Sequence, residues 1–285
     1  MTATALGVSS PVGVIAGGGA MPFAVAESLK ARGLDPVLFG LKGVCDPAAA
    51  ERFRHHWITL GQYGRARKLF RQENCKNLVF IGTLVRPSLS EIRLDWATLR
   101  IMGQVWSAFR GGDDHLLSGV GRIFEQDGFR LLGLKEVAPD LLMPEGCVTR
   151  RMPDQGAVSD IARGREVLRA LGPFDIGQAV VVIDNHVVGV EGIEGTDALL
   201  KRIADLRAAG RIRAASGRGA LVKAPKNGQD LRFDLPTVGS RTVEGVAAAG
   251  LAGLAVIAGN TVVADPQAMI EAADAGGLFI VGQPS

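Results

Sequence analysis

The chain has 285 residues, which exceeds the usual length of one domain and predicts two domains of similar size. Hydrophobic residues make up 47% of the sequence and charged residues 21%, proportions that supply sizeable cores and exclude a mainly disordered chain. The net charge of +3 is spread along the chain, and the longest basic cluster, residues 202–218, contains no aromatic side chain, which disfavours a nucleic-acid-binding protein.

The cysteine pattern and the lack of long apolar runs predict a cytoplasmic protein. Cys45, Cys75 and Cys147 are isolated and lack CxxC spacing, which disfavours a zinc site and indicates a reducing compartment. Residues 1–10 do not resemble a signal peptide, and no apolar run reaches the ~20 residues of a membrane-spanning helix. We therefore expect a soluble protein, with an anionic lipid surface as an alternative partner of the basic cluster.

The first half of the chain predicts a parallel sheet. Val12–Ala16 and Pro36–Leu41 are short buried runs, and apolar residues recur between them with helical period. This β-loop-α-β opening requires parallel strands joined by right-handed crossovers. Further helices are expected at 61–73, 94–109 and from 113 to about 127, and further strands at 77–82 and 129–133.

Residues 137–149 contain prolines and glycine without clear periodicity and predict a linker. We place the domain boundary near residue 143, which gives domains 1–143 and 144–285. In the second domain an Asp184-Asn185 turn between two valine-rich runs predicts a hairpin, so we expect an α/β domain with a mixed sheet. The expected strands are 178–183, 186–190, 220–224, 253–258, 261–263 and 278–281, and the expected helices are 160–171, 196–209, 240–249 and 266–275.

The loop Gly17-Gly18-Gly19 leaves the first strand and enters the first helix. Backbone N–H groups of such a loop can approach a phosphate, and a helix N-terminus favours an anion. The third glycine of a dinucleotide-binding fingerprint is replaced by Pro22, and the second strand ends near Gly40 instead of an acid, so NAD binding is disfavoured. The alternatives are a phosphate or sugar site and a tight turn without a ligand.

Two further loops follow predicted strands. Gly82 begins the segment GTLVRP, whose Arg86 could grip a phosphate or lie on the surface. The segment VEGIEGTD contains Glu194, Gly195 and Thr196, with Thr196 as a helix N-cap and either Glu191 or Glu194 as a candidate ligand contact. The adjacent pair His55-His56 favours a surface position over a metal site.

The most informative segment is LVKAPKNGQDLRFDLPTVGSRT, which concentrates acids and bases in a loop between a strand and a helix. Hydrolysis of a pyrophosphate needs cations that neutralise phosphate charge and a carboxylate that holds a metal or orients water. In an extended chain, Asp230, Arg232 and Asp234 would share one face. Mutual salt bridges are the alternative. The candidate polar residues here are Lys223, Lys226, Gln229, Asp230, Arg232, Asp234 and Thr242.

The chain resembles the LpxI-type UDP-2,3-diacylglucosamine pyrophosphatases in five segments that span nearly its whole length: GVIAGGGAMP, GTLVRPSL, DIGQAVVV, VEGIEGTD and LVKAPKNGQDLRFDLPTVGSRT. The resemblance implies an N-terminal Rossmann-like domain, a distinct C-terminal α/β domain, and a dimer. It implies hydrolysis of UDP-2,3-diacylglucosamine to UMP and 2,3-diacylglucosamine 1-phosphate, in lipid A synthesis, with Mg²⁺. The enzyme would work in the cytoplasm or transiently at the inner-membrane surface, without nucleic acid.

The resemblance also implies a catalytic aspartate in the C-terminal domain. We expect Asp234 in this role, with Asp230 as its metal partner, and Lys223 and Arg232 as cations that neutralise developing charge. The expected substrate-binding residues are Gly17, Gly18, Gly19, Gly82, Arg86, Glu194, Gly195, Thr196, Gln229 and Thr242. The alternatives are a non-catalytic nucleotide- or lipid-binding protein and a Rossmann-type oxidoreductase.

Overall fold

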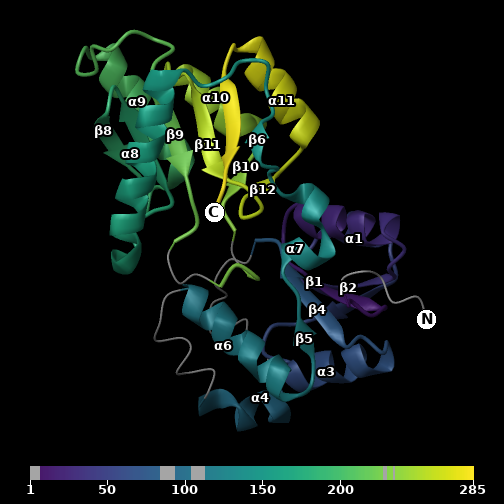
Figure 1. Ribbon diagram of the computed structural model, residues 1–285. Coiled ribbons are helices and arrows are strands. Elements are labelled where there is room, and N and C mark those ends of the chain that lie inside the picture. Colours follow the sequence, from purple (N-terminus) through teal and green to yellow (C-terminus); the bar gives the residue numbers. More distant parts are fainter. Residues whose placement is uncertain (1–6, 84–93, 104–112, 227–229, 234) are drawn as a thin grey trace. The chain divides into compact units, whose positions relative to one another are not determined.

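The computed structural model describes residues 7–83, 94–103, 113–226, 230–233 and 235–285 (Figure 1). The chain divides into two compact units. Unit 1 comprises Met1–Asp140 and Arg232–Asp234, and unit 2 comprises Leu141–Leu231 and Leu235–Ser285. Arg232 and Phe233 therefore pack with the N-terminal unit although they lie late in the sequence.

Unit 1 contains a five-stranded sheet in the order β3-β2-β1-β4-β5, and all its pairs are parallel, as predicted. The chain builds β2 and β3 on one side of β1 and then returns to place β4 on the other side. The sheet thus has a topological switch point between β1 and β4. The strands are β1 Val12–Ala16, β2 Pro36–Leu41, β3 His55–Ile58, β4 Asn77–Ile81 and β5 Arg130–Leu131.

Helices cover both faces of this sheet. Phe70 and Phe124, from α3 and α6, pack on one face in a cluster that includes Phe39 and Leu78 of the strands. Helices α1 and α7 contact each other and lie on the opposite side (Figure 1). The described helices of unit 1 are α1 Met21–Ala31, α2 Pro47–Ala50, α3 Tyr63–Gln72, α4 Trp96–Arg100, α6 Asp113–Gln126 and α7 Leu134–Val137.

Unit 2 has a six-stranded sheet in the order β6-β13-β11-β9-β7-β8. Strands β9, β11 and β13 are parallel, whereas β7 runs antiparallel to β9 and forms the predicted hairpin with β8. The mixed sheet is therefore confirmed. A separate parallel pair joins β10 and β12. The strands are β6 Gly146–Cys147, β7 Ala179–Ile183, β8 His186–Val190, β9 Ala220–Lys223, β10 Thr237–Val238, β11 Gly253–Ile257, β12 Val262–Val263 and β13 Phe279–Gln283.

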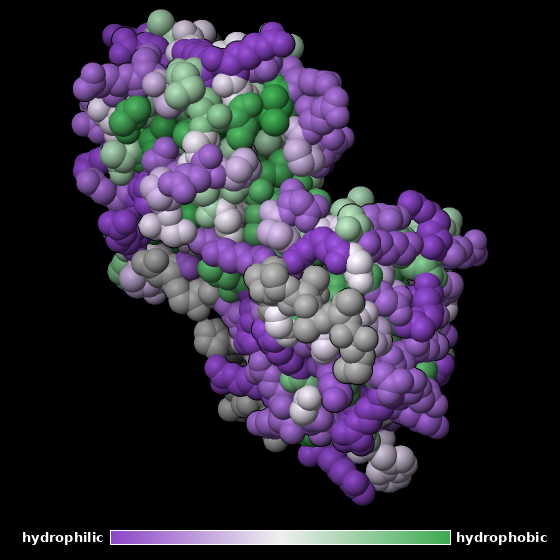
Figure 2. Space-filling model, turned by 45° about the vertical axis from the view of Figure 1, so that its right-hand side comes forward, coloured by the Kyte–Doolittle hydropathy of each residue, from purple (hydrophilic) through white to green (hydrophobic). Residues whose placement is uncertain are grey.

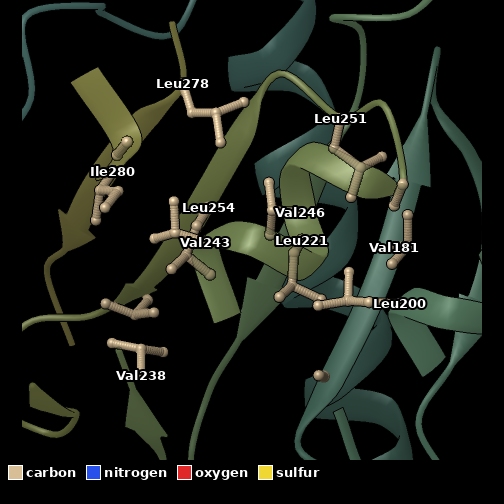
Figure 3. Packing of buried hydrophobic residues seen from close by; sticks show 14 of the residues in the cluster. Val181, Leu200, Leu221, Val238, Val243, Val246, Leu251, Leu254, Leu278 and Ile280 are labelled. Atoms are coloured by element: carbon tan, nitrogen blue, oxygen red, sulfur yellow. The ribbon is translucent and has the colours of Figure 1, made fainter. Parts of the chain in front are cut away.

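The sheet of unit 2 has a hydrophobic cluster on each face. Val181 joins the cluster shown in Figure 3, where strand residues point toward Leu200, Val243 and Val246 from the helices. Val180 and Val182 face the other cluster, beneath α8. Strand β7 is apolar at every position because both of its faces are covered. The helices are α8 Gln155–Leu171, α9 Gly195–Ala208, α10 Ser240–Ala248 and α11 Pro266–Ala275.

Some predicted connections contain regular structure. The predicted linker 137–149 includes a 3₁₀ helix, Pro139–Leu141, and strand β6, which pairs antiparallel with β13. Strands β3 and β10 were not predicted. In the described part of the helix expected at 94–109, Trp96–Arg100 and residues 102–103 are helical, with a turn at Ile101 between them. Strand β6 and strand β10 have two residues each, and their partners are distant in sequence, which explains why periodicity missed them.

Within the described residues, no helix is long and apolar enough to cross a membrane. Figure 2 shows hydrophilic side chains over most of the face it presents, with hydrophobic residues gathered in patches. Such patches on a folded chain indicate contact surfaces when charged side chains surround them.

Candidate functional site

The first candidate site lies at the switch point of the unit 1 sheet, where ligands of open parallel sheets bind. The loops that leave β1 and β4 pair with each other here. The Gly17 N–H donates to the Ile81 carbonyl at 2.8 Å, and Gly18 and Thr83 exchange backbone hydrogen bonds of 2.8 and 2.9 Å. The predicted glycine loop and the loop after β4 are therefore brought together.

Glycine is needed because the two backbones approach so closely. A Cβ atom on Gly17 would lie 2.7 Å from the Thr83 carbonyl oxygen, and one on Gly82 would lie 2.7 Å from the Gly18 carbonyl oxygen. Gly82 also has a φ of +102°, a conformation that L side chains rarely adopt. The N–H groups of Gly17 and Gly18 donate to backbone carbonyls at this crossing, so they are not available as the phosphate donors that were predicted.

The three N–H groups at the start of α1 remain available for an anion. Gly19 has a φ of +87°, and the N–H groups of Gly19, Ala20 and Met21 have no acceptor among the residues that the structure describes. Pro22 lies in the first turn of α1 and has no N–H, while Phe23 donates to the Ala20 carbonyl at 3.1 Å. This helix N-terminus can hold a phosphate with backbone donors alone.

The end of β2 has no room for the acid that would hold a nicotinamide-cofactor ribose. A Cβ atom on Gly40 would lie 2.7 Å from the Trp57 ring. Packing of an aromatic ring at this point therefore disfavours the dinucleotide-binding alternative.

The acid/base loop reaches unit 1 through Arg232 and Phe233. The Phe233 ring packs edge-on against Phe80 of β4, with 5.5 Å between centroids. Arg232 binds Glu125 of α6 with 2.6 Å between Nη1 and Oε1. Leu231–Phe233 form a turn, so the extended chain expected to place Asp230 and Arg232 on one face is wrong for these residues. Asp230 is half-buried, and Asp234 lies outside the described residues.

The second candidate site lies at the carboxyl edge of the unit 2 sheet. Lys223 is the last residue of β9, and only 9% of its surface is exposed. Its Nζ donates to the Thr237 carbonyl of β10 at 2.9 Å. A buried ammonium held by a backbone carbonyl is a fixed positive charge, which suits the neutralisation of a phosphate.

Glu191 is a buried carboxylate at the same edge. It follows β8, is 8% exposed, and accepts hydrogen bonds from the Gln178 N–H at 2.6 Å and from Thr196 Oγ1 at 2.7 Å. The Gln178 carbonyl in turn accepts from the Ala224 N–H at 2.9 Å, next to Lys223. Because β7 is antiparallel to β8 and β9, its first residue meets their last residues, and Gln178 connects the acid to the cationic strand.

The predicted residues Glu194, Gly195 and Thr196 form the entry to α9. Glu194 is the N-cap residue, and its own backbone N–H, the Arg202 side chain and the Gly192 N–H lower the pKa of its carboxyl group. Thr196 is the second helical residue and donates to Glu191, so its predicted N-cap role is wrong. The helix begins at Gly195, one residue before the predicted start, and Gly195 has a φ of +79°.

Two polar residues that sequence reasoning missed follow β11 at this edge. Asn260 and Thr261 are buried, and Asn260 Oδ1 and Thr261 Oγ1 have no hydrogen-bond partner within the described part of the chain. The next residue, Val262, pairs with Thr237, whose carbonyl holds Lys223. Unsatisfied buried polar atoms indicate a missing water or ligand. The available signal was a Gly-Asn-Thr sequence directly after a buried strand.

Exposed apolar residues border the Gln178–Glu191 pair. Phe174 and Ile176 precede β7, and Ile193 follows β8 and is fully exposed. The two loops are held together because Gly177 lies so close to the Glu191 carbonyl that a Cβ atom would be 2.1 Å from its oxygen. We call Phe174, Ile176 and Ile193 the apolar rim.

The remaining predicted residues are distributed between the units. Thr242 is buried in the first turn of α10, and Lys226 binds Asp175 with 2.6 Å between Nζ and Oδ1. Arg86 and Gln229 lie outside the described residues. Lys223, Glu194, Gly195, Thr196 and Thr242 lie in unit 2, whereas Gly17, Gly18, Gly19, Gly82 and Arg232 lie in unit 1.

Among the described residues, no group of three or more His, Cys, Asp or Glu side chains forms a metal cluster. The described residues would fit a Mg²⁺ ion that is bound by one or two carboxylates. Phosphate oxygens or water would then complete its coordination shell, which is the usual arrangement at phosphate sites.

Comparison with known proteins matches both halves of the chain. Residues 11–141 match the family described as LpxI N-terminal domain, and residues 144–281 match the family described as LpxI C-terminal domain. The UDP-2,3-diacylglucosamine pyrophosphatase LpxI of Caulobacter vibrioides is 40% identical to this chain over 271 residues. These residues cover 95% of this chain and 96% of the relative.

Proposed function

This chain belongs to the LpxI family, and from that premise we propose that it hydrolyses the pyrophosphate of UDP-2,3-diacylglucosamine. The products are UMP and 2,3-diacylglucosamine 1-phosphate, in lipid A synthesis. The observation that carries the proposal is the 40% identity to a pyrophosphatase over 95% of the chain, with both domains matched in order.

The chemistry is direct attack of water on one phosphorus. The oxygen of water forms a bond to that phosphorus, the bond from the phosphorus to the bridging oxygen breaks, and the bridging oxygen leaves with the other phosphate. Lys223 neutralises charge on the phosphates because the Thr237 carbonyl holds its ammonium at the sheet edge. The Gly19–Met21 N–H groups are the donors we assign to a phosphate in unit 1.

We assign Asp234 and Asp230 to the attacking water and to Mg²⁺. A carboxylate accepts a proton from water or orients it, and Mg²⁺, when bound, adds positive charge at the phosphates. Asp230 and Asp234 are the two carboxylates that would hold the ion, in agreement with a site of one or two acids. The positions of Arg86 and Gln229 in the sequence support a further role in substrate binding.

The two acyl chains need an apolar surface, and the apolar rim supplies one beside Glu191 and Gln178. The lipid nature of the substrate favours work at the cytoplasmic face of the inner membrane. A dimer, implied by resemblance to the family, is also part of the proposal.

The proposal is tested by measuring UMP release from UDP-2,3-diacylglucosamine by the purified full chain with Mg²⁺. We expect Asp234→Ala and Asp230→Ala each to lower kcat by about 10²–10⁴-fold, as removal of an acid–base or metal-binding group does. Asp205→Ala is the matched control because Asp205 is an exposed acid on α9 that pairs with Lys201 at 2.7 Å.

Near-wild-type rates for both aspartate variants would reject the assignment of these residues. Absence of UMP release by the wild-type chain, with the substrate still bound in calorimetry, would instead favour a non-catalytic lipid- or nucleotide-binding protein.

A further inference from the structure

The outer side of α4 exposes large apolar side chains. Trp96 is 83% exposed, Leu99 is 45% exposed, and Leu94, just before the helix, is 46% exposed. Monomeric proteins normally cover a tryptophan, so an exposed Trp beside two leucines marks a contact surface.

Polar contacts with α3 fix which side of α4 faces outward. Asp95 caps α4 by accepting from the Thr98 N–H at 2.8 Å, and Thr98 Oγ1 donates to the Gly61 carbonyl at 2.5 Å. Asp95 Oδ2 also accepts from the Arg65 N–H at 3.1 Å. Ala97 packs against Gly64, where a Cβ atom would be only 2.8 Å from the Ala97 Cβ. Trp96 and Leu99 point to solvent because Ala97 and Thr98 are held inward.

Exposed cations lie beside this apolar side. Arg65, Lys68 and Arg71 on α3 and Arg100 on α4 are exposed, and none forms an ion pair with any residue that the structure describes. Together with Leu94, Trp96 and Leu99, we call these four cations the α3–α4 surface. A hollow of ≈ 520 Å³ on α3 is lined by Gly64, Arg67, Lys68, Arg71 and Gln72.

Three acids in or beside α3 and α4, within the part of the chain that the structure describes, already have partners. Asp127 binds Arg67 at 3.0 Å and the Tyr63 hydroxyl, Glu73 binds His56 at 2.6 Å, and Asp95 caps α4. Hydrogen bonds from Thr98 and Arg65 outweigh the effect of burial and lower the pKa of Asp95. The α3–α4 surface therefore keeps a positive charge that suits an anionic partner.

The α3–α4 surface begins at the carboxyl edge of the unit 1 sheet. Helix α3 starts at Tyr63, shortly after β3 ends at Ile58, and α4 contacts the first turn of α3. The Gly17–Gly19 loop leaves β1 at the same edge, because β1 and β3 run in the same direction. Contact through α4 would thus occur on the side of unit 1 where a phosphate site is proposed.

We propose that the α3–α4 surface docks this protein on an anionic phospholipid bilayer. Trp96 and Leu99 enter the interfacial layer, where tryptophan is favoured, and Arg65, Lys68, Arg71 and Arg100 contact the head groups. The docking proposal rests on the proposed function, because a lipid substrate gives the protein a reason to bind a membrane. Charge complementarity favours a bilayer over a second copy of the chain, since two copies would bring eight cations together.

The first test is co-sedimentation of the full chain with vesicles of phosphatidylethanolamine and phosphatidylglycerol. Replacing Arg65 and Lys68 together by Gln should weaken binding about 30-fold at low salt, because each cation near an anionic surface contributes about fivefold. Trp96→Ala should weaken binding about tenfold through lost apolar burial. Met152→Ala, which removes an exposed apolar side chain of unit 2, and Arg211→Gln with Arg213→Gln are the matched controls and should bind like wild type.

The second test locates Trp96 directly. Lipids with brominated chains should quench tryptophan emission of the wild-type chain more than that of Trp96→Phe, because the bromine atoms reach only an inserted side chain. Circular dichroism of each variant checks that the fold is kept.

The docking proposal is overturned if the wild type does not bind anionic vesicles, or if it binds phosphatidylcholine vesicles equally well at all salt concentrations. It is also overturned if the variants bind like the wild type. A lower oligomeric state of Trp96→Ala with unchanged vesicle binding would instead assign the surface to a second copy of the chain. UMP release from substrate dispersed in detergent separates the two proposals. Docking variants should keep this rate, whereas failure of the proposed function abolishes it in the wild type.

Discussion

The carboxyl edges of the two sheets are packed in different ways. In unit 1, Gly17, Gly18 and Gly82 let two strand-end loops touch, and the polar groups offered to a ligand are backbone N–H groups. In unit 2, the edge is filled by the side chains of Lys223 and Glu191, each buried and hydrogen-bonded. One edge depends on the absence of side chains, whereas the other depends on charged side chains whose partners are fixed.

This difference teaches where substitutions should act. A side chain added at the unit 1 edge displaces backbone and should lower the free energy of unfolding. Loss of a charge at the unit 2 edge leaves the backbone in place and should lower turnover.

Among the variants that compare the two edges, the largest expected effect is that of Lys223→Met on turnover. Met has a similar length and keeps the packing but removes the ammonium, so we expect kcat for UMP release to fall about 10²–10³-fold. Loss of the bond to the Thr237 carbonyl should by itself lower the free energy of unfolding by about 1–2 kcal/mol. A kcat within about threefold of wild type, at equal folding, would remove Lys223 from the chemistry and weaken the contrast between the edges.

The next effect is that of Gly82→Ala on stability. The positive φ and the 2.7 Å approach to the Gly18 carbonyl oxygen should together lower the free energy of unfolding by about 3 kcal/mol, measured by urea titration. Gly43→Ala is the control, since Gly43 has a φ of +77° but no atom within 4 Å of the added Cβ, and should cost about 1 kcal/mol. Equal losses at both positions would show that close approach does not constrain the unit 1 edge.

The smallest expected effect on stability is that of replacing Asp95. This acid lies near the unit 1 edge and accepts hydrogen bonds from backbone N–H groups, as Glu191 does in unit 2. Burial alone would raise the pKa of Asp95, but hydrogen bonds from Thr98 and from Arg65 lower it overall. A lowered folded-state pKa stabilises the protein above the unfolded pKa of about 3.9, and this contribution is lost as the pH falls through the folded value.

Asp95→Asn should therefore be less stable than wild type at neutral pH by below about 1 kcal/mol, because Asn still caps a helix. The difference should shrink as the pH falls below about 4 in urea titrations, and it should vanish only below the folded-state pKa of Asp95. A difference that stays constant with pH would show that the charge of Asp95 contributes nothing at this edge.

Sequence reasoning was most accurate where turn residues mark the ends of an element. Strands β1, β2 and β8 and helix α11 have the predicted bounds because glycines, prolines and turn residues lie at or beside their ends. Strand β3 was missed because His55-His56 suggested a surface pair. His56 instead stacks on Phe39 at 5.6 Å and binds Glu73 at 2.6 Å, contacts that depend on residues distant in the chain.

The roles of the candidate site residues stay predictions, whereas their arrangement came from the structure. Lys223 was singled out as a member of the acid/base segment between a strand and a helix, but its contact with Thr237 of β10 was not predicted. Asn260 and Thr261 were missed because their interest comes from buried atoms without partners, which a sequence does not reveal. The assignment of Arg232–Asp234 to unit 1 depends on Phe233 packing against Phe80, a contact across more than 150 residues of chain.

The sequence by itself determined the α/β class, the parallel opening, the hairpin and the family, because periodicity, turn residues and ordered motifs are local properties. Only the tertiary structure decided that Gly17 and Gly18 donate to strand-end carbonyls, that Glu191 binds Gln178 and Thr196, and that Trp96 is exposed. These outcomes depend on which distant groups contact each hydrogen-bond donor and each apolar surface, and such contacts form only when the elements pack together.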